Sequence, residues 1–277
     1  MDKCEISKRI EGFVEHLELE EKSTATINKY TRDIRHFMNW LPHCEIKKTT
    51  VIKYKEYLVK KYKPRSVNSM IAALNCFFKY INRYDLVIKP IKIQQQPFRN
   101  QSLYITREEY QKMVDLTTDT QTKMLIQTLA NSGIRVSEVQ DLTVEAVKEK
   151  EFIIYNKGKS RIVYIPKMLR KELMNYCEKQ KIKNGSIFIN KDGKSLNRVT
   201  IWRKIKKAAR ESGILETKAF PHNFRHLYAV TFYEKNKDVD LLATILGHSS
   251  INTTRIYIQE DKLSCIKKIE RAFYTTT

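Results

Sequence analysis

Cysteine is scarce in this 277-residue chain, and the few cysteines are widely dispersed. No two of them form a CxxC pair, so their spacing lacks the pattern of a structural zinc site. An odd, scattered set of cysteines is typical of reduced thiols, which predicts a cytoplasmic protein. The five are Cys4, Cys44, Cys76, Cys177 and Cys265.

Long apolar runs and nucleotide-binding motifs are also missing. No stretch of about 18 apolar residues occurs, so no membrane-spanning segment is expected. The chain begins MDKCEISKRIEGF, which lacks the apolar centre of a secretory signal. It has no glycine-rich P-loop and no acidic cluster of the kind that holds a catalytic metal. We therefore expect no cofactor and no metal.

Positive charge, in contrast, is abundant. The 52 Lys and Arg residues against 31 Asp and Glu give a formal net charge of +21. Such a field attracts polyanions, and nucleic acid is the commonest polyanion in a cell. A ribosome-associated protein or a very soluble surface would explain the same charge, but nucleic-acid binding is the favoured interpretation. Hydrophobic residues make up 42% of the chain, close to the globular norm, which predicts folded domains.

The spacing of apolar residues divides the chain into two parts. Helical spacing in the first part predicts four short amphipathic helices, with Ser23 or Thr24 and later Ser66 as caps. The stretch VIKPIKIQQQPFRNQS then breaks the pattern and is typical of an extended linker. We predict an N-terminal helical domain at 1–91, a linker at 92–102 and a C-terminal domain at 103–277.

The C-terminal part is expected to be mostly helical with one short hairpin. Thr106 and Glu109 have capping-box spacing ahead of a helix. EFIIYN and RIVYIP are rich in β-branched and aromatic residues, and the turn KGKS joins them. The expected fold class is therefore mainly α (α+β), with a small antiparallel sheet in the C-terminal domain.

Four segments of the C-terminal part carry residues suited to chemistry on a phosphate. Taken alone, each has an ordinary structural explanation, such as an ion pair, a solvated lysine or a packed tyrosine. In chain order they are NSGIRVSEVQDL with Arg135 and Glu138, NKGKS with Lys157, PHNFRHLYAV with His222, Arg225 and His226, and LLATILGHSSINTTRIYI with His248 and Tyr257.

Together, these residue types are the ones needed to cut a phosphodiester without a metal. Tyrosine has a pKa of about 10, so it needs a cationic pocket and a nearby base before it attacks at neutral pH. Two guanidiniums can hold the non-bridging oxygens and neutralise the charge that grows in the transition state. A lysine can protonate the departing sugar oxygen.

The ordered set SGIRVSEV, the hairpin lysine, HNFRH and LGHSSINTTRIY closely resembles the tyrosine recombinases, the phage integrase family. The resemblance covers essentially the whole C-terminal half, and the N-terminal half is similar in layout to the family's core-binding domain. It implies a site-specific DNA recombinase that cuts and rejoins strands through a covalent 3′-phosphotyrosine, with two domains that clamp DNA. Since the chain lacks the extra arm-binding domain of many phage integrases, a compact Xer-like or transposon-associated type is expected.

The same resemblance assigns the groups that act directly on the DNA. Tyr257 corresponds to the nucleophile, and Arg135 and Arg225 to the pair that holds the scissile phosphate. Lys157 corresponds to the general acid for the 5′ oxygen. Lys159 lies only two residues further along the hairpin and is the alternative for that role.

Four further residues receive supporting roles from the resemblance. His222 is expected to assist proton transfer at the tyrosine, and His248 to hydrogen-bond a phosphate oxygen. Glu138 matches the family's acidic position and is expected to orient its neighbours. His226 is expected to support its helix from behind, and a carboxylate partner stays open for it.

The implied partner is double-stranded DNA that carries recombination sites. Exchange between two duplexes needs four active sites, which implies a homotetramer on DNA and a monomer or dimer without it. Ile266, Ile269 and Phe273 predict a C-terminal helix that docks onto a neighbouring protomer, or else folds back on its own domain.

Two other functions stay open at this point. One is a DNA-binding regulator or accessory protein on the same fold, which the filled chemical positions argue against. The other is a relaxing enzyme of the type IB topoisomerase kind, which shares the chemistry. Cleavage at a specific sequence followed by exchange between two sites would separate a recombinase from that enzyme.

Overall fold

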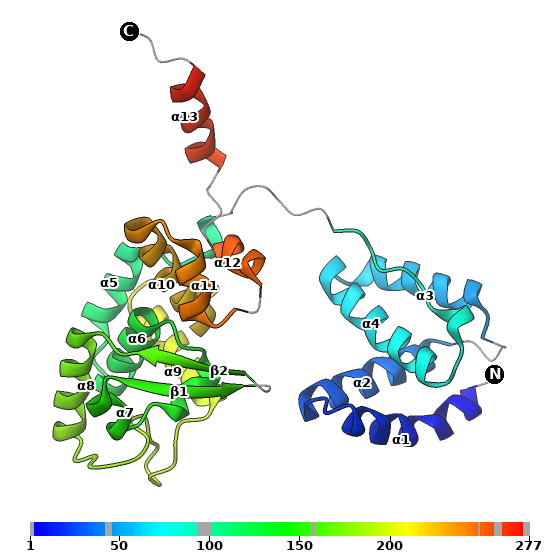
Figure 1. Ribbon diagram of the computed structural model, residues 1–277, viewed down its shortest axis with the longest axis horizontal. Helices are drawn as coiled ribbons and strands as arrows, with labels where there is room; N and C mark the ends of the chain where they lie inside the picture. The colour runs from blue at the N-terminus through cyan, green and yellow to red at the C-terminus, as the bar shows by residue number, and fades with distance from the viewer. Residues whose placement is uncertain are drawn as a thin grey trace. The chain divides into compact units, whose positions relative to one another are not determined.

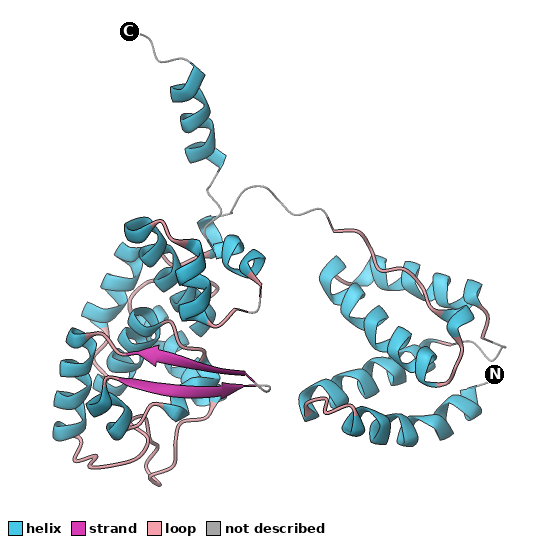
Figure 2. Cartoon of the chain, in the orientation of Figure 1, coloured by secondary structure: helices cyan, strands magenta, loops and turns pink. Residues whose placement is uncertain are grey.

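A computed structural model describes residues 3–41, 46–93, 101–156, 159–248, 250–257 and 262–273. These residues are mainly helical and include one two-stranded antiparallel sheet, which confirms the predicted fold class (Figures 1 and 2). The chain divides into two compact units, Met1–Gln95 and Gln96–Thr277. The division falls inside the predicted linker at 92–102, and the boundaries predicted for the domains stay a prediction. None of the described helices has the length and apolar character needed to cross a membrane.

The described part of the N-terminal unit contains four helices around an aromatic core. Ser23 caps the second helix by accepting a hydrogen bond from the backbone N–H of Thr26, as predicted. The fourth helix begins at Pro64, so the prediction that Ser66 caps it is wrong. Proline has no N–H to leave unsatisfied and suits the first turn of a helix. The helices are α1 (Lys3–Leu19), α2 (Thr24–Trp40), α3 (Lys48–Lys61) and α4 (Pro64–Tyr80), followed by the 3-10 turn η1 (Tyr84–Leu86).

The C-terminal unit combines most of the described helices with one hairpin (Figure 1). The predicted capping box is present, because Thr106 and Glu109 exchange side-chain and backbone hydrogen bonds at the first helix. In chain order its elements are η2 (Gln101–Leu103), α5 (Arg107–Leu116), α6 (Thr120–Ser132), η3 (Val136–Asp141), α7 (Val144–Glu149), β1 (Glu151–Asn156), β2 (Lys159–Tyr164), α8 (Lys167–Lys179), α9 (Arg198–Glu211), α10 (Pro221–Asn236), α11 (Val239–Leu246), α12 (Ile251–Tyr257) and α13 (Lys262–Phe273).

The hairpin presents one face to the core of its unit. Phe152 and Ile154 on β1 and Val163 on β2 are buried, whereas the residues between them on β1 are exposed. This alternation follows from the two-residue period of a strand. Asn156 pairs with Lys159, so Lys159 and Ser160 belong to β2 and the predicted four-residue turn KGKS is wrong. The structure describes the strands on both sides of residues 157 and 158.

A small apolar cluster joins the last helices of the site region. Ala229 of α10, Leu242 and Leu246 of α11, and Tyr257 of α12 are buried against one another. Because α10 also packs on α6, this cluster connects the end of α12 to the large core of the C-terminal unit. The position of Tyr257 is therefore fixed by packing as well as by polar contacts.

Candidate active site

The loop after α6 delivers the first arginine. Gly133 ends α6 in the left-handed conformation, with φ of 64°. A Cβ at that position would lie 2.6 Å from the ring of Tyr228, so both the backbone and the space favour glycine. Two residues later Arg135 stands at the N-cap of η3, and its side chain is about one third exposed (35%).

Glu138 holds Arg135 at two points. One carboxylate oxygen accepts from the backbone N–H of Arg135 at 2.7 Å, and the other accepts from its guanidinium at 2.8 Å. Glu138 is only 2% exposed. Burial acts to raise its pKa, but hydrogen bonds from Arg135 and the charges of Arg161 and Arg135 bring the pKa below its ordinary value. The carboxylate is therefore charged at neutral pH.

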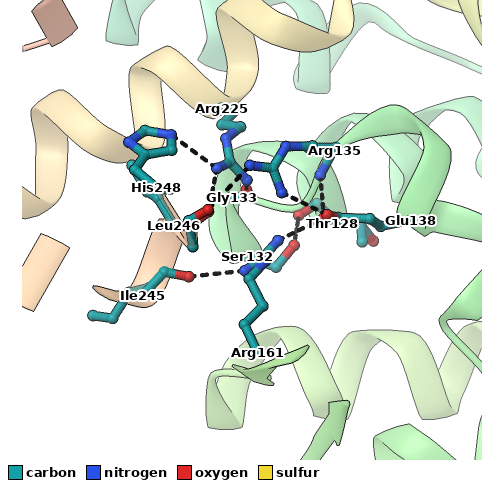
Figure 3. A network of polar contacts seen from close by, with 11 residues as sticks. Thr128, Ser132, Gly133, Arg135, Glu138, Arg161, Arg225, Ile245, Leu246 and His248 are labelled. Atoms are coloured by element: carbon teal, nitrogen blue, oxygen red, sulfur yellow. Dashed lines mark hydrogen bonds and ion pairs between the residues drawn. The ribbon is translucent and has the colours of Figure 1, made fainter. Parts of the chain in front are cut away.

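Arg225 is almost fully buried, at 2% exposed, on α10. Its guanidinium donates to the carbonyl of Gly133 at 2.5 Å and to that of Leu246 at 2.5 Å. The same group lies 3.1 Å from Nε2 of His248 (Figure 3). Burial, together with the charges of Arg135 and Arg161, lowers its pKa to about 10, so Arg225 remains charged at neutral pH.

His248 follows α11 and has a defined proton arrangement. Gly247 ends α11 in the left-handed conformation, with φ of 61°. A guanidinium can only donate, so Nε2 of His248 accepts from Arg225 and Nδ1 donates to the hydroxyl of Thr254 at 2.8 Å. Burial and the charges of Arg225 and Arg135 lower the pKa of His248 to about 4. The imidazole is therefore neutral at pH 7.

Tyr257 ends α12 and is 6% exposed. Its hydroxyl lies 3.5 Å from Nε2 of His222, and the rings of His222, His226 and His248 surround its own ring at centroid distances of 5.5, 5.3 and 5.4 Å. Burial raises the pKa of Tyr257, while Arg225 and Arg135 oppose that rise through their charges. The phenol is protonated at rest and lies beside an imidazole.

His222 and His226 approach the tyrosine from α10. Partial burial and the charges of Arg225 and Arg135 lower the pKa of His222, which favours its neutral, proton-accepting form. His226 is buried and stacks on Tyr104 with ring centroids 4.0 Å apart. Its predicted supporting role stays a prediction.

Seven of the eight predicted site residues lie in the described part of the chain, and Lys157 lies outside it. For the alternative, Lys159, the structure describes the backbone in β2. The structure brings all seven described residues together through the contacts given above; these are Arg135, Glu138, His222, Arg225, His226, His248 and Tyr257.

Sequence reasoning missed two residues of this site, Arg161 and Thr254. Arg161 donates to Glu138 at 2.5 Å and to the carbonyl of Ile245 at 2.8 Å. One signal for it was available, since Arg161 occupies a core-facing position in a strand pattern and a buried arginine needs a partner. Thr254 carried no comparable signal.

Guanidinium groups dominate the electrostatics of the site. Arg135 and Arg161 contact the buried carboxylate of Glu138, and Arg225 donates to the end of α11 beside them (Figure 3). The described residues contain no group of three or more His, Cys, Asp or Glu side chains arranged to hold a metal ion. An anion such as a phosphate diester suits this arrangement, and a tyrosine hydroxyl lies next to it.

The sequence matches two family profiles. The profile described as "Phage integrase family" matches residues 104–263, and "Phage integrase, N-terminal SAM-like domain" matches residues 10–84. The chain is also 30% identical over 273 residues to the tyrosine recombinase XerA of Pyrococcus horikoshii. That alignment covers 95% of this chain and 93% of the relative.

Solved structures share the fold at low sequence identity. The XerH site-specific recombinase, in a post-cleavage complex with its palindromic difH substrate, superposes with a TM-score of 0.74 at 19% identity, covering 95% of this chain and 84% of that one. A lambda integrase tetramer bound to a Holliday junction gives a TM-score of 0.75 at 14% identity, covering 93% of this chain and 77% of that one.

Proposed function

The chain belongs to the phage integrase family and is a tyrosine recombinase, a site-specific DNA strand transferase, and we propose that Tyr257 is its nucleophile. The observation that carries this proposal is the place of the Tyr257 hydroxyl, 3.5 Å from a neutral imidazole and beside the buried guanidinium of Arg225. The Tyr257 oxygen attacks the scissile phosphorus and the bond to the 5′ oxygen breaks. The product is a 3′-phosphotyrosine and a free 5′ hydroxyl.

Arg135 and Arg225 hold the non-bridging oxygens of that phosphate. Both guanidiniums donate to backbone carbonyls near the end of α11, which keeps them close together before DNA arrives. Arg135 is partly exposed and has donors free to turn toward a ligand, whereas Arg225 is buried and held from three sides. Preorganised donors of this kind stabilise a pentacovalent transition state without a large reorganisation cost.

Protons move through histidine and lysine. His222 takes the proton of the Tyr257 hydroxyl as the oxygen attacks, which its lowered pKa permits at neutral pH. His248 is held by Arg225 and Thr254. It donates to a phosphate oxygen once that oxygen replaces it as the acceptor for Arg225 and its proton lies on Nε2, with Nδ1 then accepting from the Thr254 hydroxyl. Lys157, by resemblance to the family, gives a proton to the departing 5′ oxygen.

Rejoining reverses the same steps. A 5′ hydroxyl from the second duplex gives its proton to Lys157 and attacks the phosphotyrosine, and Tyr257 leaves with the proton returned by His222. The covalent bond conserves the energy of the broken phosphodiester, so the resealing needs no nucleotide. Glu138 keeps Arg135 oriented through both halves of the cycle.

We further propose a homotetramer on DNA, with a monomer or dimer in its absence. Two duplexes and four cut strands require four copies of Tyr257. The lambda integrase structure named above is a tetramer on a Holliday junction, and it supports the same assembly here. In α13, Ile266, Ile269 and Phe273 are 37%, 51% and 78% exposed and are proposed to dock onto a neighbouring protomer.

The proposed nucleophile is tested by trapping the covalent complex on a nicked suicide duplex taken from DNA that flanks the gene. The parent protein should form an adduct that survives denaturant. Tyr257→Phe should bind the same DNA with near-normal affinity and form no adduct, because affinity comes from many phosphate contacts whereas the attacking atom is one oxygen.

A matched control is Tyr233→Phe, which removes a phenol hydroxyl from the same small core cluster. It should form the adduct at the parent rate. If the adduct persisted in Tyr257→Phe and vanished in Tyr233→Phe, the nucleophile would have to be reassigned.

A further inference from the structure

Arg161 is the third arginine of the site and faces the core from a strand. It lies on β2 directly opposite Ile154, which is 3% exposed, and its own side chain is 11% exposed. An arginine is almost never buried without partners, because removing a charge from water costs free energy. Its contacts therefore indicate why it is there.

The first contact is with the carboxylate that orients Arg135. Nη2 of Arg161 lies 2.5 Å from Oε2 of Glu138, the oxygen that also accepts from the backbone N–H of Arg135. The other oxygen of Glu138 accepts from the Arg135 guanidinium. Two arginines thus share one buried carboxylate, and Arg161 binds the oxygen that the Arg135 guanidinium does not contact.

The second contact is with the end of α11. The last carbonyls of a helix have no partner inside it and carry partial negative charge. Here three consecutive carbonyls, of Ile245, Leu246 and Gly247, accept from Arg161, Arg225 and Arg135 in turn. Figure 3 shows the contacts of Ile245 and Leu246. Arg161 holds the first of the three, three residues before His248.

The alkyl part of Arg161 also fills the space beneath that turn. A Cβ on Gly247 would lie 2.2 Å from Cδ of Arg161 and 3.1 Å from its Nε. Gly247 thus meets two requirements at once, the left-handed backbone and close approach of the arginine. Any shift of Arg161 would move the turn that positions His248.

We propose that Arg161 is a positioning residue for strand cleavage. It acts through two residues that meet the phosphate. Through Glu138 it orients the Arg135 guanidinium, and through the Ile245 carbonyl it fixes the position of the turn that carries His248. The inference rests on the proposed function of the site and adds a residue to it.

The variant that tests it is Arg161→Lys. Lysine keeps a positive charge beside the buried Glu138, so the fold is retained, but one ammonium cannot reproduce the forked contact to a carboxylate and a carbonyl. Cleavage of the nicked suicide duplex should slow by roughly 10²-fold, the scale expected when reacting groups are misplaced by about 1 Å. DNA affinity and the thermal midpoint should stay close to those of the parent.

A second substrate separates positioning from general damage. A methylphosphonate at the scissile position replaces one charged oxygen with a methyl group, so it needs less neutralisation by a guanidinium. If Arg161 acts through Arg135, the deficit of Arg161→Lys should shrink on this substrate in the same proportion as that of Arg135→Ala. Arg210→Met, which removes an exposed ion pair with Glu216 in the same unit, serves as the control and should match the parent on both substrates.

Each outcome bears on the proposal. Parent-like cleavage by Arg161→Lys, or equal slowing on both substrates, would overturn it and leave Arg161 a residue that only stabilises the fold. If the lysine variant unfolds, the double variant Arg161→Met with Glu138→Gln replaces it, because this change removes both buried charges. The proposal then requires that the cleavage deficit of the double variant shrink on the methylphosphonate substrate. A parent protein that forms no adduct on either substrate would instead overturn the proposed function, which makes the two failures distinguishable.

Discussion

The proton on the leaving oxygen has two candidate donors, Lys157 and Lys159, two residues apart on the hairpin. Lys157→Ala should slow cleavage by roughly 10²–10⁴-fold, the usual scale for general acid catalysis. Replacing the bridging 5′ oxygen with sulfur makes a better leaving group that hardly needs a proton. Most of the lost rate should return in Lys157→Ala on this substrate, measured by single-turnover cleavage.

Two control variants test whether the rescue on the sulfur substrate is specific to Lys157. Arg135→Ala should recover little on the sulfur substrate, because a guanidinium acts on the non-bridging oxygens. Rescue of Lys159→Ala in place of Lys157→Ala would move the general acid two residues along the hairpin. Equal rescue of Lys157→Ala and Arg135→Ala would remove the assignment altogether.

His248 should make the stability of the C-terminal unit depend on pH. Its folded pKa of about 4 lies below the ordinary value of 6.5, so the unfolded chain binds more protons between these two pH values. The stabilisation is fully present above pH 6.5 and is lost as pH falls toward 4. His248→Asn should therefore lose less stability over this range than the parent.

The measurement can be confined to one unit because the two tryptophans lie in different units. Trp40 belongs to the N-terminal unit and Trp202 to the C-terminal unit. In a Trp40→Phe background, urea unfolding followed by Trp202 fluorescence at several pH values reports on the C-terminal unit. Identical slopes for parent and His248→Asn would contradict the stated burial effect.

At the residue scale, the sequence predicted the chemical groups better than their surroundings. The residues around Tyr257 could be named from motifs, and six of them do lie together in the structure. The role of Arg161 could not be predicted, because its partners Glu138 and Ile245 are 23 and 84 residues away in the chain. A sequence pattern reports on near neighbours, whereas a buried ion pair depends on tertiary packing.

At the scale of elements, local rules worked where local energies decide. The cap of α2 by Ser23 and the capping box of α5 were predicted from spacing and residue type. The hairpin was predicted, but its turn was predicted to span four residues, 157–160. The residue types of this stretch are all common in turns, so composition did not show that residues 159 and 160 belong to the second strand. Cross-strand pairing of Asn156 with Lys159 is a contact between strands, which composition does not encode.

The helix α13 gives a prediction about assembly. Removing residues from Ser264 onward should weaken cooperative assembly on a full recombination site by more than it weakens binding to a single half-site. The reason is that Ile266, Ile269 and Phe273 are exposed in this chain and would bury their apolar area only against a partner. Gel-shift titrations on half-sites and full sites measure the two quantities.

A full-length comparison avoids the loss of a whole helix. Ile269→Ser with Ile266→Ser should reproduce the truncation, while Lys267→Ser with Glu270→Ser alters two exposed polar positions of the same helix without changing net charge. Equal loss at half-sites and full sites, or collapse of the thermal midpoint, would mean that α13 folds back on its own unit.

At the scale of the whole molecule, the chemistry needs little besides a DNA duplex held against a small cationic site. The net charge of +21 supplies long-range attraction, and the site supplies orientation. In the proposed function affinity and catalysis are separable, since phosphate contacts spread over the protein would carry the first and Tyr257 with its neighbours the second. Salt is therefore expected to weaken DNA affinity and to have little effect on the cleavage step.

DNA affinity should consequently fall steeply with salt. A protein that contacts 6–10 phosphates loses roughly 10³–10⁵ in affinity between 50 and 200 mM salt, because each contact releases counterions. Lys60→Gln, Lys61→Gln and Lys63→Gln together, at and just after the end of α3, should reduce the slope by about one for each lysine that contacts a phosphate. Lys179→Gln, Lys181→Gln and Lys183→Gln remove the same charge from exposed positions at and just after the end of α8 and should leave the slope nearly unchanged. Equal effects of the two triple variants would mean that net charge alone governs binding, and a flat dependence in the parent would contradict the electrostatic interpretation itself.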